Sequence, residues 1–72
     1  MTNDKNIDDA YEWRKIEEFV EGDILRAGNM DNIVTGIKVF GKVIRLYYIH
    51  DGKDKYLNDN IGNEYRARKR EA

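Results

Sequence analysis

The segment 33–57, IVTGIKVFGKVIRLYYIHDGKDKYL, constrains the fold of this chain more than any other part of it. Gly41-Lys42 puts Gly first in a two-residue connection, which is typical of a type II′ turn. Asp51-Gly52 is a pair typical of a type I′ turn. The residues around these turns are rich in β-branched and aromatic side chains, which favour strands. We therefore predict three consecutive antiparallel strands, at residues 33–40, 43–50 and 53–57.

The two turns set the strand registers independently, and both place the same apolar side chains on one face. The first turn pairs Ile37 with Leu46, and it pairs Thr35 with Tyr48. The second turn pairs Leu46 with Leu57. Because side chains alternate between the two faces of a strand, a slip of one residue at either turn would scatter this set. The predicted core face consists of Ile33, Thr35, Ile37, Val39, Ile44, Leu46, Tyr48 and Leu57.

The opposite face collects basic and aromatic side chains, and Gly36 leaves space there beside Tyr47. Lys38 is predicted to lie directly across from Arg45, an arrangement of like charges that is destabilising. Tyr47 lies across from Tyr56, and such an aromatic pair stabilises a hairpin without any ligand. Two interpretations stay open, a partly buried second face and a platform for a macromolecule. The predicted members of this face are Lys38, Phe40, Val43, Arg45, Tyr47, Tyr56 and Asn58.

Residues 8–21, DDAYEWRKIEEFVE, have the period of an amphipathic helix that would cover the core face. Gly22 is a plausible end for this helix, although residues 19–21 also fit an extended chain. Residues 23–27 predict a short strand. Residues 64–68 fit either a fifth strand or the start of a helical tail. The apolar side of the predicted helix carries Ala10, Trp13, Ile16, Phe19 and Val20.

The predicted fold is α+β and mostly β, with an N-terminal amphipathic helix followed by an antiparallel β-meander. We expect a disordered N-terminus at 1–6, a single small domain at 7–68 and a basic tail at 69–72. The segment 19–25, FVEGDIL, has the pattern hydrophobic-x-x-Gly-Asp-hydrophobic. With the helix and the meander, it resembles the layout of small SH3-like or Tudor-like barrels. The resemblance implies a small barrel, with closure of the sheet left open, and it implies no particular function.

Charge is divided along the chain, although the net charge is only −1. Residues 1–24 hold eight acidic and three basic residues, whereas residues 25–50 hold four basic residues and one acidic residue. This division fits either a solvated surface or two partner surfaces of opposite sign. The N-terminal sequence is polar, and the apolar runs are far shorter than a membrane span. We therefore expect a cytoplasmic protein that does not enter a membrane.

The residue types that carry most enzyme chemistry are scarce. The chain has no Ser and no Cys, which excludes the usual hydroxyl and thiol hydrolases. His50 is the only histidine, and we expect it to be exposed beside the second turn. The glycines do not have phosphate-loop spacing, and the segment 51–59 lacks the Gly and Glu of a calcium loop. We predict that the protein is not an enzyme and uses no metal or other cofactor.

Two functions from different classes fit these features. The first is a small regulator that docks on a larger protein or protein complex, as phage and mobile-element proteins do on host transcription machinery. The second is a nucleic-acid-binding module that uses the basic and aromatic face and the basic tail. The acidic N-terminal segment and the net charge weigh against the second function. The chain could be a monomer or a homodimer. In both cases the predicted partner-binding residues are Lys38, Arg45, Tyr47, Tyr56, Arg66, Arg68 and Arg70.

Overall fold

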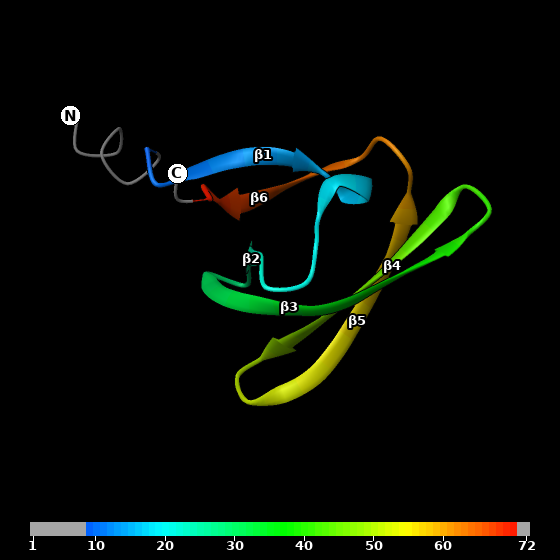
Figure 1. Ribbon diagram of the computed structural model, residues 1–72. Helices are drawn as coiled ribbons and strands as arrows, with labels where there is room; N and C mark the ends of the chain where they lie inside the picture. The colour runs from blue at the N-terminus through cyan, green and yellow to red at the C-terminus, as the bar shows by residue number, and fades with distance from the viewer. Residues whose placement is uncertain (1–8, 71–72) are drawn as a thin grey trace.

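A computed structural model describes residues 9–70, and within them six strands form one antiparallel sheet (Figure 1). The strand order is β1-β6-β2-β3-β4-β5, so the first and last strands of the chain are neighbours. β2 and β6 share a single register pair, Leu25 with Ala67. The elements are β1 (Tyr11–Lys15), the 3-10 turn η1 (Ile16–Glu18), β2 (Ile24–Ala27), β3 (Met30–Phe40), β4 (Val43–His50), β5 (Lys53–Asn60) and β6 (Glu64–Arg68).

The predicted three-strand meander is confirmed as β3, β4 and β5. Gly41 has a φ of 60°, and Lys42 does not have a positive φ, as a type II′ turn requires. Asp51 and Gly52 have φ values of 54° and 77°, as a type I′ turn requires. β3 starts three residues earlier than predicted and β5 ends three residues later. The turn chemistry therefore located both hairpins correctly, although the predicted strand ends were in error.

The first hairpin departs from its predicted register at a β-bulge between residues 34 and 36. Beyond the bulge, Tyr48 pairs with Val34 and not with Thr35. Val34 is therefore buried, while Ile33 faces solvent and is 48% exposed. The prediction was wrong for Ile33 and Thr35 because a bulge inserts one residue and reverses the alternation on one strand only. Gly36, next to the bulge, is the kind of strand glycine that often accompanies one.

The predicted helix at 8–21 is wrong. The chain forms β1 and η1 there, and Phe19 is extended, in agreement with the alternative interpretation of residues 19–21. Trp13 and Val20, two members of the predicted apolar stripe, are 61% and 53% exposed, although Ile16 and Phe19 are buried. β6 pairs with β1 over five residues and supplies the backbone hydrogen bonds that a helix would have made internally.

The sheet covers its own core, so the core does not need a helix on top of it. Figure 1 shows the sheet bent, with β1 and β6 on one side of the fold and β3, β4 and β5 reaching across to the other. The strand order has two free edges, β1 and β5, so within the described residues the sheet is not closed into a barrel. Val39, predicted in the core, is instead exposed near the end of a hairpin. The buried cluster consists of Phe19, Leu25, Val34, Leu46 and Ala67, and each large side chain contributes about 1.5–3 kcal/mol.

The two ends of the chain are only partly described. The predicted disordered segment 1–6 lies outside the described residues, as do residues 71–72 of the predicted tail. The segment 64–68 is a strand, and after it the Lys69 backbone N–H donates to the Ala10 carbonyl at 2.9 Å. Within residues 9–70, no helix has the length and apolar character needed to cross a membrane.

Candidate functional site

Four of the seven predicted partner-binding residues lie together on the outer face of β3, β4 and β5. By the outer face we mean the side of the sheet turned away from the buried core. Lys38 pairs with Arg45, and Tyr47 pairs with Tyr56, as the turns predicted. The two tyrosine rings are 5.9 Å apart between their centroids and tilted by 57°. Sequence reasoning could bring these residues together because hairpin registers are local.

Arg45 is held in place by neighbours on both adjacent strands. Its guanidinium carbon lies 5.0 Å from the ring centre of Phe40 and 4.6 Å from that of Tyr56. Its Nε donates a hydrogen bond to Oδ1 of Asn58 at 2.9 Å. Attraction between the cation and two rings offsets the repulsion expected from Lys38 across the strand. We call Phe40, Arg45, Tyr47 and Tyr56 the aromatic–arginine cluster.

The aromatic–arginine cluster is a surface and not a second core. Phe40 is 48% exposed and Tyr56 is 56% exposed, while Arg45 and Tyr47 are half-buried. The Tyr47 ring packs beside Gly36, where an added Cβ would lie 3.6 Å from Cδ2 of the ring. This is the space that the sequence predicted beside Tyr47. The cluster therefore presents ordered but accessible rings to solvent.

Arg66 and Arg68 lie apart from this cluster, on β6, with β2 in between. The Arg66 guanidinium lies 5.1 Å from the ring centre of Trp13, which is exposed on β1. Nη1 of Arg68 lies 3.3 Å from Oδ2 of Asp31. Sequence reasoning assigned Trp13 to a helix and so missed this second aromatic and basic surface. The pairing of the first strand with the last, which creates it, has no local signal.

Asp31 neutralises part of the basic charge beside β6. Its Oδ1 accepts hydrogen bonds from the Tyr11 hydroxyl at 2.8 Å and from Nη1 of Arg26 at 3.1 Å. Burial alone would raise the pKa of Asp31, but the hydrogen bonds from Tyr11 and Arg26 outweigh it and lower that pKa. The hydrogen bond to Asp31 in turn raises the pKa of Tyr11. Arg26 and Arg68 therefore share an ionised partner at neutral pH.

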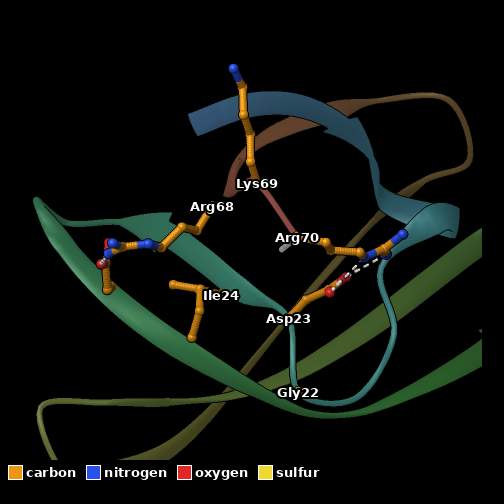
Figure 2. A pocket seen from close by; sticks show the side chains of 7 residues that line it. Gly22, Asp23, Ile24, Arg68, Lys69 and Arg70 are labelled. Atoms are coloured by element: carbon orange, nitrogen blue, oxygen red, sulfur yellow. Dashed lines mark hydrogen bonds and ion pairs between the residues drawn. The ribbon is translucent and has the colours of Figure 1, made fainter. Parts of the chain in front are cut away.

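Arg70, the last predicted site residue, makes an ion pair within the molecule. Its Nε and Nη2 donate to the two carboxylate oxygens of Asp23 at 3.0 and 2.8 Å, and Nη2 also donates to the Glu18 carbonyl at 2.9 Å. Figure 2 shows this ion pair beside a hollow of about 410 Å³, where β2 and β6 separate. Lys69 points away from the hollow. Arg70 closes the open end of the β2–β6 seam and is not part of the cluster.

Sequence reasoning missed an apolar hollow on the outer face of β2, β3 and β4. Ile24 pairs with Ile33, and Ile33 pairs with Ile49, so the three side chains form one row across the strands. Together with Met30 they line a hollow of about 440 Å³. The bulge in β3 puts Ile33 on this face. Gly36 inside a strand pattern is the only sequence signal that could have indicated the bulge.

His50 is half-buried and not exposed as predicted. Its Nδ1 lies 2.8 Å from Oδ1 of Asn32. The buried Asn32 amide nitrogen donates to the carbonyls of Leu25, Ala27 and Met30, so its oxygen is the acceptor and His50 Nδ1 carries the proton. His50 thus supports the β2–β3 hairpin. Among residues 9–70, no three His, Cys, Asp or Glu side chains are grouped as metal ligands would be.

No protein-family model matches this chain, and searches of the curated proteins and of the solved structures found no match either. The aromatic–arginine cluster and the apolar hollow are therefore interpreted from their own geometry.

Proposed function

We propose that this protein is a non-enzymatic binding module that docks on a larger protein through the outer face of its sheet. The aromatic–arginine cluster carries the proposal, because Arg45 lies on Phe40 and Tyr56 while both rings stay about half exposed. Tyr and Arg side chains are enriched among the residues that dominate protein interfaces. A guanidinium that is already held in place loses less conformational freedom on binding than a mobile one.

Apolar side chains extend this surface along β4. Every second residue of a strand points to the same side of the sheet, and Arg45, Tyr47 and Ile49 are spaced in this way along β4. Ile33 lies across from Ile49 and is exposed on the same side. Exposed apolar side chains that adjoin one another mark interaction surfaces, whereas scattered ones do not. This continuity supports a protein partner that covers both the cluster and the apolar hollow.

A nucleic acid fits the same face less well. Arg45 lies over Phe40 and Tyr56 and occupies one side of each ring, where a base would stack. Beside β6, Arg26 and Arg68 both form ion pairs with Asp31 and are therefore already partly neutralised. The net charge is −1, and binding to a phosphate backbone depends on uncompensated basic charge. These three observations favour a protein partner over DNA or RNA.

The proposed partner is a component of a larger assembly, such as the host transcription machinery on which phage and mobile-element regulators act. A sequence without Ser or Cys fits a role that works by contact and steric effect. The compact outer face, and not the predicted basic tail, is the proposed contact surface.

The test is site-specific photo-crosslinking in extract of the source cells, with a photoreactive phenylalanine analogue at position 56 of the full chain. The same analogue at Lys55, whose side chain points to the opposite face of β5, is the control. The captured protein is then purified, and its affinity is measured for Arg45→Ala, Tyr56→Ser and Lys55→Ala. We expect Arg45→Ala and Tyr56→Ser to weaken binding at least about 10-fold, and Lys55→Ala to leave it unchanged.

Three outcomes would contradict the proposal. The first is equal crosslinking from positions 55 and 56, and the second is an affinity that Arg45→Ala and Tyr56→Ser do not change. The third is capture of DNA or RNA from position 56, with binding that weakens steeply with salt and is lost when Lys38 and Arg45 are both changed to Glu. That third outcome would establish the nucleic-acid function instead.

A further inference from the structure

The apolar hollow next to the aromatic–arginine cluster is built from three strands. Ile24, Ile33 and Ile49 form its floor, and Met30 stands beside them. Ile33 is 48% exposed and Ile49 is 37% exposed, so the isoleucine side chains face solvent and do not fill the core. An opening of about 440 Å³ can admit a large apolar side chain of another molecule.

The rim of the hollow is acidic. Asp51 lines it from the β4–β5 turn, and Asp54 lies directly across from Ile49 on the same face. Within residues 9–70, neither Asp51 nor Asp54 forms an ion pair, whereas Asp31, which also lines the hollow, is engaged by arginines. Two uncompensated carboxylates beside an apolar surface attract a cation and disfavour an anion.

We infer that the hollow receives an apolar side chain of the protein partner, and that a lysine or arginine beside that side chain pairs with Asp51 and Asp54. The inference rests on the proposed function and specifies the chemistry of the segment that the partner contributes. The apolar side chain supplies most of the affinity by burying surface against Ile33 and Ile49. The cation supplies selectivity, because an acidic neighbour in its place would meet two like charges.

The same rim argues against two other occupants. A nucleic acid would bring phosphates against Asp51 and Asp54, which repel them. A second copy of this chain, paired about a two-fold axis through the hollow, would bring two acidic rims close together. A basic and apolar protein segment is the occupant that the charges favour.

The test is selection of a displayed library of random 12-residue peptides on the immobilised full chain. Peptides that bind are expected to combine a large apolar residue with a neighbouring Lys or Arg. A synthetic copy of one enriched peptide is then titrated against the variants. Ile33→Ser should weaken binding about 10-fold, and Asp51→Asn with Asp54→Asn should weaken it about 3-fold and remove most of its salt dependence.

Val39→Ser is the matched control, because Val39 is an exposed aliphatic residue of the same strand that does not line the hollow. It should leave the titration unchanged. The inference is overturned if no peptide is enriched, if the enriched peptides are acidic, or if Ile33→Ser and Val39→Ser have equal effects. None of these results bears on crosslinking at Tyr56 or on the Arg45→Ala affinity, so a failure here is distinguishable from a failure of the proposed docking face.

Discussion

At the scale of single residues, Asp23 is a buried carboxylate that pairs with both Arg14 and Arg70. Its side chain is 5% exposed, and Nη1 of Arg14, a side chain that is 4% exposed, lies 3.2 Å away. The carboxylate also accepts the Val20 backbone N–H at 3.0 Å and the two hydrogen bonds from Arg70. Burial alone would raise the pKa of Asp23, but Arg70, the Val20 N–H and Arg14 outweigh it and lower that pKa.

Asp23→Asn should lower the free energy of unfolding by about 2 kcal/mol, because the buried Arg14 guanidinium then keeps only the more exposed Glu12 as an ionised partner. Asp31→Asn, which removes the partner of two more exposed arginines, should cost at most about 1 kcal/mol. Urea unfolding of both variants at neutral pH measures the difference.

The pKa of Asp23 is lower in the folded chain than in the unfolded chain, so its ionised carboxylate contributes its full stabilisation above about pH 4. This contribution is lost as the pH falls further. The acid branch of the stability curve should therefore flatten in Asp23→Asn.

Tyr65 should make the protein sensitive to alkaline pH. Burial and a hydrogen bond from its hydroxyl to Asp59 raise the pKa of Tyr65 to about 12. A tyrosine in the unfolded chain titrates at about pH 10, so Tyr65 contributes its full stabilisation below that pH. This contribution is lost as the pH rises towards 12. We expect the stability of the wild type to fall over this range more than that of Tyr65→Phe. Parallel alkaline slopes for the two proteins in denaturant titrations would contradict the assignment.

At the scale of elements, the two-residue turns determine the hairpins. Gly41→Ala should cost about 1–2 kcal/mol, because only Gly adopts the φ of 60° at this turn position without strain. Lys42→Ala, at the neighbouring position without a positive φ, should change stability by less than about 0.5 kcal/mol. Thermal unfolding of the two variants under one buffer condition tests this. Equal losses would mean that the turn backbone is not the cause.

The elements that were predicted incorrectly share a physical reason. Trp13, Ile16 and Phe19 fit a helical stripe, but β1 pairs with β6, whose residues lie 49 to 57 positions further along the chain. Helical periodicity is a local signal, and a long-range strand pairing overrides it. The bulge near Gly36 acted in the same way within one strand, because one inserted residue exchanged the faces of Ile33 and Val34.

At the scale of the whole molecule, the two ends of the described chain hold each other in place. β1 pairs with β6, and the residues after β6 bind back to the loop before β2 through Arg70 and Asp23. Arg70→Ala should lower the free energy of unfolding by about 1 kcal/mol. The loss is small because the Arg70 side chain is half exposed, so solvent screens its ion pair with Asp23. Lys69→Ala removes the same charge at the adjacent position and should have little effect. Similar losses in urea unfolding would show that net charge, and not the Asp23 contact, is responsible.

Some contacts of the candidate site depend on neighbours in the chain, and others depend on distant strands. Lys38, Arg45, Tyr47 and Tyr56 could be brought together from the sequence because two tight turns set their pairing. Arg66, Arg68 and Arg70 were predicted as partner-binding residues, yet the structure places them against Trp13, Asp31 and Asp23. Partners on distant strands cannot be read from the alternation within a single strand.

The sequence alone determined the turns at 41–42 and 51–52, the meander between and around them, and a face shared by Lys38, Arg45, Tyr47 and Tyr56. These features depend on backbone conformations and pairings between neighbours in the chain, so short-range chemistry was sufficient. Only the tertiary structure decided that the N-terminal segment is a strand, that Ile33 lies on the outer face and that Arg70 binds Asp23. Those outcomes depend on which distant segment completes the backbone hydrogen bonds and ion pairs, and no local pattern records that choice.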